Sequence, residues 1–385
     1  MSIRILWYNW RDIKNPEAGG AEVFTHEVCK RLLHQKNGID SITLFTSSFS
    51  GGLQEEIIDG IKIIRRGNKY SVYREAKTFY NQHEKDFDIV VDEINTKPFN
   101  TPSFVRNKPI VALIHQLARE FWFYETKFPI NVLGYFFLEK YWLSKYRHIP
   151  TITVSKSTYE DLANWGFRHI TIVHEGLGFS SLDKLPEKES KPTVLFVGRL
   201  KKAKKPDDAL RAFKIIKDEI PDAQLWIVGS GYMLKGLRDM AVEMFPNTPP
   251  NITITVFGRQ NAEMKLGLMA RAHVLLVPGV REGWGLVVTE ANAMGTPAVA
   301  YDVPGLRDSV IDRVTGSLVH RGDYVAMAIE ASDLLKDNVK RETYSKNALE
   351  DAKYFDWDRT SAECLEVLKS TLARYKDSVG ELRIV

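Results

Sequence analysis

Short runs of apolar residues alternate with longer amphipathic stretches along the whole chain. The apolar runs are rich in Val, Ile and Leu, which is typical of parallel strands that are covered on both faces. Helical periodicity marks the stretches between them, such as 21–35, 206–220 and 261–272. The expected strands are Ile3–Tyr8, Ile42–Thr46, Ile89–Glu93, Ile110–His115, Thr151–Val154, Thr193–Val197, Gln224–Val228, Ile252–Phe257, His273–Val277 and Ala298–Tyr301.

The alternation starts again after residue 190, which indicates two doubly wound α/β domains rather than one large sheet. The segment Phe179–Pro192 is polar and charged and contains two prolines, which is the composition of a linker. A length of 385 residues also suits about two domains. We expect an N-terminal domain over residues 1–180 and a C-terminal domain over 181–357, with a helix at about 358–385 that packs back on the first domain.

Composition, charge and the lengths of the apolar runs exclude several classes of protein. The net charge of +4 is too small to indicate nucleic-acid binding, and two cysteines, Cys29 and Cys364, exclude a disulfide framework. The N-terminus lacks the features of a signal peptide, and no apolar run is long enough to span a membrane. We expect a cytoplasmic protein, either soluble or peripheral on the cytoplasmic face of a membrane.

The first candidate binding motif is the pair Gly19 and Gly20, which follows the first strand and begins a helix. Glycines there allow close backbone approach, and a helix N-terminus attracts anions. Such glycines are also common turn residues. The motif is not Gly-x-Gly-x-x-Gly and no P-loop lysine follows, which disfavours an NAD-dependent oxidoreductase and a P-loop enzyme.

A second motif follows the first strand of the C-terminal domain, where cations cluster over Arg199–Lys205. The carboxyl edge of an open α/β sheet is where ligands bind. We interpret Lys201 and Lys202 as solvated loop residues. Arg199 directly follows a glycine at the strand tip, where a guanidinium can hold phosphate oxygens.

The most specific motif runs from Pro278 to Pro297 and contains two glutamates, Glu282 and Glu290. The residues Gly283–Gly285 precede a helix expected over Leu286–Met294, so backbone amides face outward there. The segment thus offers amide donors for a diphosphate and two carboxylates that accept from vicinal hydroxyls. The alternative for Glu290 is an exposed helix glutamate without a ligand.

With these motifs the chain resembles the retaining glycosyltransferases of family four, which have the architecture called GT-B. In that architecture two Rossmann-like domains face each other across a cleft. The resemblance covers essentially the whole chain. Its motifs here are Gly19–Glu22, Val154–Thr158, Val197–Leu200 with Lys204, Glu282–Glu290, Gly295–Pro297 and Val314–Val319.

The resemblance implies a role for each matching residue. Arg199 and Lys204 would hold the donor diphosphate, Glu290 the nucleotide ribose and Glu282 a hydroxyl of the transferred sugar. His115, at a strand end, would contact the donor sugar, although a lone histidine there is more often structural. The implied catalytic set is His115, Arg199, Lys204 and Glu282. The donor-binding set adds Gly19, Gly20, Gly283, Trp284, Gly285, Leu286 and Glu290.

The chain departs from the family pattern at three places. Lys205 stands where the family usually has glycine, which leaves open whether Lys204 or Lys205 reaches phosphate. Trp284 replaces the usual phenylalanine and is expected to narrow the pocket. The segment His174–Leu177 replaces a common Asn-Gly pair, and no contact is assigned to it.

The segment Phe121–Arg147 mixes many aromatic residues with Lys127, Lys140 and Lys145. Such a surface suits a membrane interface, which would fit a lipid-linked acceptor. The alternative is that the aromatics fill the core of the first domain and only the cations reach water.

The expected activity is retaining transfer of a hexose from a nucleotide-diphosphate sugar to a hydroxyl of a glycan or lipid-linked acceptor. No spacing of metal ligands is present, and no cofactor is expected beyond the sugar nucleotide as co-substrate. The resemblance implies front-face attack, with the leaving phosphate as base. Two alternatives stay open, a nucleotide-sugar epimerase of the same architecture and a non-catalytic sugar-nucleotide-binding protein.

Overall fold

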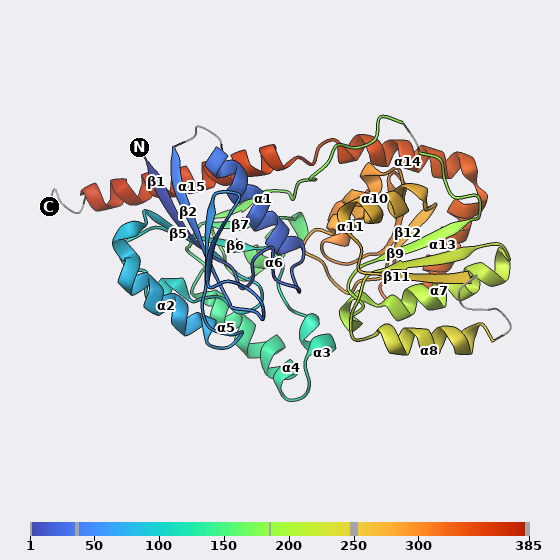
Figure 1. Ribbon diagram of the computed structural model, residues 1–385, viewed down its shortest axis with the longest axis horizontal. Coiled ribbons are helices and arrows are strands. Elements are labelled where there is room, and N and C mark those ends of the chain that lie inside the picture. Colours follow the sequence, from blue (N-terminus) through green and yellow to red (C-terminus); the bar gives the residue numbers. More distant parts are fainter. Residues whose placement is uncertain (1, 35–37, 185, 247–252, 382–385) are drawn as a thin grey trace. The chain divides into compact units, whose positions relative to one another are not determined.

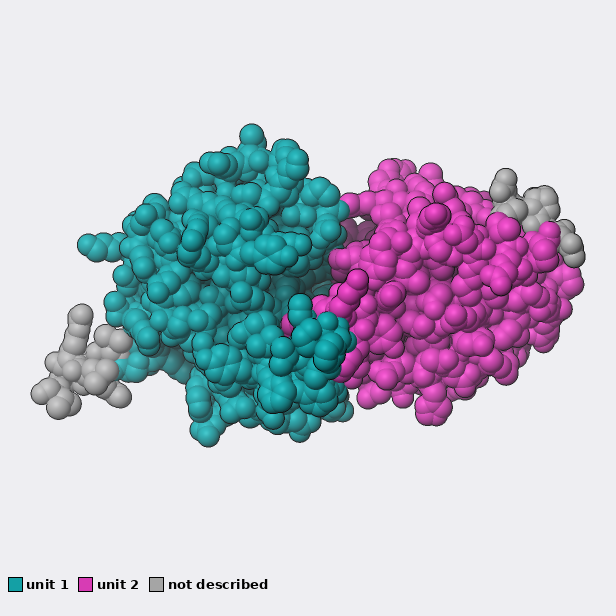
Figure 2. Space-filling model, turned by 90° about the horizontal axis from the view of Figure 1, so that it is seen from below, with its two compact units in different colours: residues 1–119, 128–176, 356–385 teal, residues 120–127, 177–355 magenta. Residues whose placement is uncertain are grey.

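The computed structural model describes residues 2–34, 38–184, 186–246 and 253–381. These residues form two compact units, each with its own sheet (Figure 1). Unit 1 comprises residues 1–119, 128–176 and 356–385, and unit 2 comprises 120–127 and 177–355 (Figure 2). Parts of several expected segments, namely Gln35, Leu185, Ile252 and residues 382–385, lie outside the described residues.

The sheet of unit 1 has the strand order β3-β4-β2-β1-β5-β6-β7-β8. All neighbours run parallel except β3 and β4, which pair antiparallel at one edge. Every residue of β5 and β6 is buried, as expected for central strands covered on both faces. The strands are β1 (Ile3–Tyr8), β2 (Ile39–Thr46), β3 (Glu55–Ile58), β4 (Ile61–Arg65), β5 (Ile89–Glu93), β6 (Ile110–Ile114), β7 (Thr151–Thr153) and β8 (Ile170–Ile172).

Helices cover both faces of this sheet, with α1 and α15 on one side and α2 and α5 on the other (Figure 1). Helix α15 packs directly on α1, although the two are far apart in the sequence. The helices of unit 1 are α1 (Gly20–His34), α2 (Val72–His83), η1 (Glu84–Asp86), η2 (Thr101–Ser103), α4 (Ile130–Leu133), η3 (Gly134–Leu138), α5 (Glu139–Ser144), α6 (Lys156–Asn164) and α15 (Trp357–Glu381).

The sheet of unit 2 has the order β11-β10-β9-β12-β13-β14, and all of its strands are parallel. Its strands and the helices that pack on them bury one large apolar core. The strands are β9 (Thr193–Val197), β10 (Gln224–Val228), β11 (Ile254–Gly258), β12 (Val274–Val277), β13 (Ala298–Tyr301) and β14 (Gly316–Val319).

Helices α10, α11 and α14 lie on one side of this sheet and α7 and α8 on the other (Figure 1). The helices of unit 2 are α3 (Phe121–Glu125), η4 (Lys202–Lys204), α7 (Pro206–Glu219), α8 (Leu234–Met244), α10 (Ala262–Arg271), α11 (Leu286–Ala293), α12 (Leu306–Ser309), α13 (Tyr324–Lys336) and α14 (Asn338–Ala352). None of the helices in the described part of the chain combines the length and apolar character needed to cross a membrane.

The predicted fold class is confirmed, since both units are α/β with essentially parallel sheets in which each expected strand occurs. The boundaries differ from the expectation. The chain passes from unit 1 to unit 2 at 176/177 rather than 180/181, and returns at 355/356 rather than 357/358.

Residues 120–127, expected in the first domain, belong to unit 2. They contain α3, which packs against η4. The guanidinium Nε of the buried Arg281 donates to Glu120 at 2.8 Å, and the amide of Ala203 donates to Glu125 at 3.2 Å. These partners are distant in the sequence, so the pattern of apolar residues around α3 does not reveal where it packs.

Candidate functional site

The two motifs of unit 2 meet at the carboxyl edge of its sheet. Strands β9 and β12 are neighbours there, while β10 and β11 extend from the other side of β9, so the strand order reverses between β9 and β12. The loop after β9 carries Lys204 and the loop after β12 carries Glu282. The amide of Val280 donates to the carbonyl of Ala203 at 3.0 Å, which joins the two loops. Open α/β sheets bind ligands at such a reversal.

Lys204 and Glu282 are brought into direct contact by these loops. The Nζ of Lys204 donates to Oε1 of Glu282, and both side chains remain partly accessible, at 24% and 13% exposure. A cation and a carboxylate that touch and still reach solvent can each bind part of one polar ligand. The residues assigned to phosphate and to a sugar hydroxyl therefore share one place in unit 2.

Lys205 has a different environment. Its Nζ lies 3.1 Å from carboxylate oxygens of Asp207 and Asp208, at the start of α7. Burial acts to lower the pKa of Lys205, but its hydrogen bonds and charge interactions with Asp207 and Asp208 raise that pKa overall. Because Lys205 is already neutralised by two carboxylates, the geometry favours Lys204 as the lysine available to a phosphate.

Arg199 directly follows Gly198 at the tip of β9, and its side chain is exposed. Within the described ranges, its guanidinium makes no hydrogen bond or ion pair with another side chain. Its five N–H donors are therefore available to an anionic ligand at the carboxyl edge of the sheet.

The backbone around Glu282 is held by a glycine that the sequence motifs did not single out. A Cβ on Gly305 would lie 2.2 Å from the carbonyl oxygen of Glu282, and Gly305 has a positive φ of 85°. The amide of Glu282 donates to the carbonyl of Pro304 at 3.0 Å. The turn after β13 therefore fixes the position of Glu282 by close backbone contact.

Helix α11 begins directly after Gly285, whose φ of 99° places it in the left-handed region. No side chain caps this end, and the first turn of a helix leaves N–H groups without intrahelical partners. Gly283, Gly285 and Leu286 therefore lie where the sequence predicted amide donors.

Glu290 lies in the same helix and is held by a lysine from α10. The Nζ of Lys265 donates to Oε1 of Glu290 at 2.6 Å, and the two side chains are 25% and 19% exposed. The second carboxylate oxygen of Glu290 remains for a ligand hydroxyl. Each of the two glutamates thus pairs with a lysine from another segment of unit 2.

Trp284 does not occupy the place that the sequence predicted for it. Its side chain is 4% exposed, its Nε1 donates to Thr289 at 2.8 Å, and its ring lies 5.1 Å from that of Phe355. The ring belongs to the packing of unit 2 and does not narrow an open pocket. A contact of Trp284 with a donor would involve its backbone.

In unit 1 the N-terminus of α1 is already bound to a carboxylate. The amide of Gly19 donates to Oε2 of the buried Glu22 at 2.6 Å, and Nε of Arg11 donates to Oε1 at 2.9 Å. Glu22 thus occupies the anion-attracting end of its own helix. The predicted contact of Gly19 and Gly20 with a diphosphate stays a prediction.

His115 follows β6 and is buried between two carboxylates. Its Nε2 lies 3.1 Å from Oε1 of Glu93, and its Nδ1 lies 3.2 Å from Oε1 of Glu175. Glu93 also accepts from Nε1 of Trp7 at 2.8 Å. With both ring nitrogens bound inside unit 1, the histidine presents no nitrogen to a donor sugar in this structure. The contact that the resemblance implies for His115 stays a prediction.

The two carboxylates decide the charge of this histidine. Burial acts to lower the pKa of His115, but the hydrogen bonds and charges of Glu175 and Glu93 raise it to about 10. The two carboxylates therefore favour the protonated ring, which donates from both nitrogens, while burial raises the pKa of Glu93. The cluster of His115, Glu93 and Glu175 is a buried ion triad at the carboxyl edge of the first sheet.

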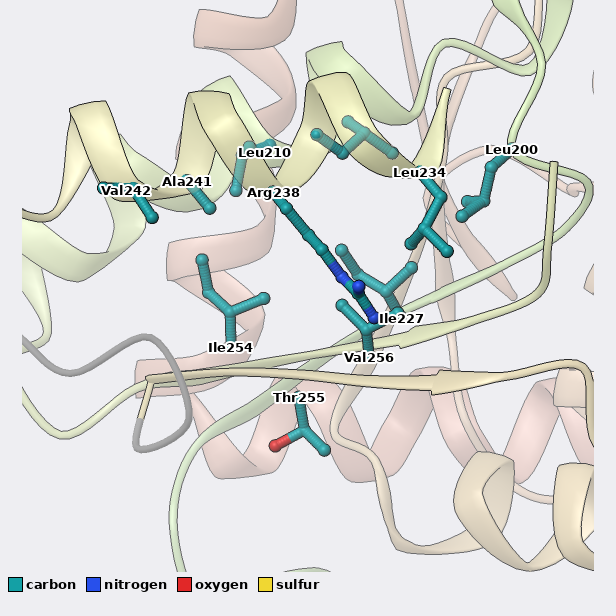
Figure 3. A pocket seen from close by; sticks show the side chains of 11 residues that line it. Leu200, Leu210, Ile227, Leu234, Arg238, Ala241, Val242, Ile254, Thr255 and Val256 are labelled. Carbon is teal, nitrogen blue, oxygen red and sulfur yellow. The ribbon is translucent and has the colours of Figure 1, made fainter. Parts of the chain in front are cut away.

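Unit 2 also contains a pocket of about 450 Å³ between α8 and strands β10 and β11 (Figure 3). Its lining is mostly aliphatic, and the side chain of Arg238 extends from α8 toward Ile227 and Val256. None of the predicted site residues lines it, although Leu200 directly follows Arg199. This pocket is thus separate from the Lys204 and Glu282 pair.

Four residues to which the sequence motifs gave no role lie beside predicted site residues in the structure, namely Glu93, Glu175, Lys265 and Gly305. Glu93 had a detectable signal, because Asp92 and Glu93 end an otherwise apolar strand. Lys265 had no such signal in the sequence. It lies in a different helix from Glu290, and helical periodicity does not relate residues of two separate helices.

Comparison with known proteins identifies the C-terminal part of the chain. Residues 180–351 match the family model "Glycosyl transferases group 1". D-inositol 3-phosphate glycosyltransferase of Salinispora tropica is 32% identical over 49% of this chain and 40% of its own length. Phosphatidyl-myo-inositol mannosyltransferase of Mycobacterium leprae is 30% identical over 51% of this chain and 53% of its own length. These matches span roughly half of either relative.

Solved structures extend the similarity of fold to nearly the whole chain. Sucrose-phosphate synthase from Thermosynechococcus elongatus superposes with a TM-score of 0.78 at 20% identity, covering 97% of this chain and 100% of its own. Anabaena HepE in complex with UDP and glucose superposes with a TM-score of 0.73 at 17% identity, covering 96% of this chain and 100% of its own. The chain therefore has the GT-B fold, and its residues 180–351 match the model of the group 1 glycosyl transferases.

Proposed function

We propose that the protein is a retaining glycosyltransferase that moves a hexose from a nucleotide-diphosphate sugar to a hydroxyl acceptor. The observation that carries the proposal is the pairing of Lys204 with Glu282 and of Lys265 with Glu290 in the group 1 domain. The first pair lies at the reversal of strand order, and the second holds a carboxylate in the helix that begins there. Together they supply a cation for phosphate and carboxylates for hydroxyls.

The proposed donor contacts follow from the chemistry of these groups. The diphosphate binds the Arg199 guanidinium, the Lys204 ammonium and the amides that open α11. Glu290 accepts from the ribose hydroxyls with the oxygen that Lys265 leaves open. Glu282 accepts from a hydroxyl of the sugar and shares Lys204 with the phosphate. The resemblance to family four and the name of the HepE complex with UDP and glucose support a nucleotide donor.

In the proposed reaction the bond between the anomeric carbon and the diphosphate oxygen breaks. The acceptor oxygen bonds to that carbon on the same face, and its proton passes to the leaving phosphate oxygen. Negative charge builds on the diphosphate, where Arg199, Lys204 and the start of α11 stabilise it. The protein thus supplies the cationic stabilisation itself, and we propose that transfer proceeds without a metal ion.

A donor panel tests the proposal. Sugar conjugates of UDP, GDP and ADP are compared by thermal shift, and the selected donor is then incubated with glycan and lipid-linked acceptors in the presence of EDTA. A ligand at a hundredfold excess over its Kd adds about 3 kcal/mol of stability, so the correct donor raises Tm measurably. We expect a product with the anomeric configuration of the donor.

The same assay separates the alternatives. An epimerase would interconvert the sugar nucleotide without any acceptor, and a binding protein would show the thermal shift without turnover. Inversion of configuration would contradict the retaining mechanism, and loss of transfer in EDTA that Mg²⁺ restores would contradict metal independence. Arg199→Ala is the site variant to compare with the wild type in this assay. It removes an exposed side chain that is proposed to bind phosphate, without disturbing a packed residue.

A further inference from the structure

A helical segment of unit 1 exposes an unusual number of large apolar side chains. Helices α4, η3 and α5 follow one another without a break over residues 130–144 and lie along the margin of unit 1 (Figure 1). We call their outward-facing residues, together with Phe128, the apolar face. Its members and their exposure are Phe128 81%, Ile130 55%, Leu133 46%, Phe136 56%, Phe137 65% and Tyr141 63%.

The opposite side of the same segment is anchored in unit 1. Gly134, Glu139 and Leu143 are buried. The carboxylate of Glu139 accepts from the backbone amides of Ala118 and Arg119, the latter at 2.9 Å. The apolar face is therefore held in place by a buried side, and its exposure is a property of the folded unit. A contiguous apolar surface of this kind marks an interaction site.

The charges on the segment indicate what it contacts. Between residues 128 and 145 the charged side chains are Glu139, Lys140 and Lys145. Glu139 is 1% exposed, whereas both lysines are exposed, so the charge that residues 128–145 expose is positive. The ammonium of Lys145 lies 5.2 Å from the ring centre of Tyr141, at the border between the charged and apolar parts.

Aromatic side chains bordered by lysines match the boundary of a bilayer that contains anionic lipids. The aromatic rings suit the headgroup region, and the lysines are attracted by the negative surface potential. In a symmetric dimer through this face, Lys140 and Lys145 of the two copies would be brought together and would repel one another. The observations therefore favour a membrane over self-association.

We propose that the apolar face docks unit 1 on the headgroup region of an anionic membrane. This inference rests on the proposed function in one respect: the docked unit would meet a hydroxyl acceptor that is presented at that membrane. The docking itself requires neither donor nor turnover, so it can fail or succeed independently of the proposed chemistry.

Vesicle co-sedimentation of the full chain tests the docking. Vesicles of phosphatidylcholine alone are compared with vesicles that contain phosphatidylglycerol, each at low and high salt. We expect binding to the anionic vesicles that weakens with salt. The variant Phe136→Ser/Phe137→Ser should reduce binding at least about tenfold, and Lys140→Glu/Lys145→Glu should reduce it similarly.

The matched control is Ile57→Ser/Tyr70→Ser, which removes two exposed apolar side chains of unit 1 outside the apolar face. All variants are checked for an unchanged Tm and an unchanged thermal shift with the donor nucleotide. Three results would overturn the proposal: no binding of the wild type to anionic vesicles at low salt, unchanged binding after the Phe136 and Phe137 substitutions, or an equal loss in the control. Concentration-dependent dimerisation that the phenylalanine substitutions abolish would also overturn it and assign the face to a second copy.

Discussion

At the scale of single residues, the two glutamates Glu282 and Glu290 of unit 2 differ in how they are held. Glu282 contacts Lys204, which lies in the loop after the neighbouring strand β9. Glu290 contacts Lys265, which lies in the adjacent helix α10. In the proposed complex, Lys204 is shared with a phosphate, while Lys265 keeps its contact with Glu290. Lys204 is therefore proposed as a ligand of the donor and Lys265 as a positioning residue.

Replacing Lys265 with Met should weaken nucleotide binding although Lys265 itself does not touch the nucleotide. Without the 2.6 Å contact, the carboxylate of Glu290 can rotate away from the ribose. We expect about a tenfold weaker Kd for the free nucleoside diphosphate, measured by calorimetry, on the scale of a hydrogen bond to a charged group.

The double variant Lys265→Met/Glu290→Gln distinguishes positioning from general destabilisation. If Lys265 acts through Glu290, the double variant should bind no more weakly than Glu290→Gln alone. Lys235→Met, on the exposed side of α8, is the control and should leave binding unchanged. Fully additive losses would contradict the positioning role.

The lysines at 204 and 205 should respond differently to alanine. Lys204→Ala removes a proposed phosphate ligand and should raise the donor Kd by about tenfold to a hundredfold with little change in Tm. Lys205→Ala leaves Asp207 and Asp208 without their lysine and should lower Tm while the donor Kd changes little. Calorimetry with thermal unfolding checks both, and a larger effect on Kd at position 205 would reverse the assignment.

At the scale of elements, the sequence predicts the strands well because the central ones are buried on both faces and read as continuous apolar runs. It does not predict β3, β4, β8 or β14. In β3, exposed and half-buried residues alternate at the sheet edge, so no apolar run marks it. Nor does the sequence place α3, because a helix of five residues carries too little periodicity to reveal its partner. Its contacts come from Arg281 and Ala203, far along the chain.

The turn after β13, which contains Gly305, should be essential for the position of the loop after β12, which carries Glu282. Gly305→Ala would place a Cβ 2.2 Å from the carbonyl of Glu282, so this loop must move. We expect transfer to fall by at least about tenfold, because a displaced catalytic group loses its orientation. The measurement is the steady-state rate of transfer at saturating donor.

Gly322→Ala is the matched control for this substitution. Gly322 has a φ of 87°, close to the 85° of Gly305, but a Cβ there meets no atom within 4 Å. Both variants therefore place alanine at a similar positive φ, and only Gly305→Ala adds the collision. Equal losses of activity in the two variants would attribute the effect to strain alone.

At the scale of the whole molecule, the restart of the alternating pattern predicts the division into two α/β units. The last helix packs on unit 1 as expected, although its amphipathic pattern does not say which unit it contacts. The resemblance assigned Lys204 and Glu282 to parts of one donor, and the structure brings the two side chains into contact. What the motifs miss are contacts between separate elements, such as Lys265 with Glu290 and His115 with Glu93. These depend on how helices and strands pack, which no local spacing encodes.

The buried triad of His115 should make unit 1 less stable as the pH rises. The pKa of His115 is raised from 6.5 to about 10, so the folded state holds one more proton than the unfolded state between these values. The stabilisation is complete below pH 6.5 and is lost as the pH approaches 10, by a few kcal/mol. Lys188 in unit 2 acts with the opposite sign, because burial and the charge of Arg341 lower its pKa from 10.5 to about 7.

A difference measurement isolates the histidine from Lys188. The free energy of unfolding is compared between the wild type and His115→Gln from pH 6 to 10. Lys188 contributes equally to both proteins, so the advantage of the wild type should shrink as the pH rises. Since His115→Gln leaves Glu93 and Glu175 without their cation and can prevent folding, the ring resonances of His115 in the wild type are also followed by NMR. They should remain those of an imidazolium beyond pH 8, and titration near pH 6.5 would contradict the triad.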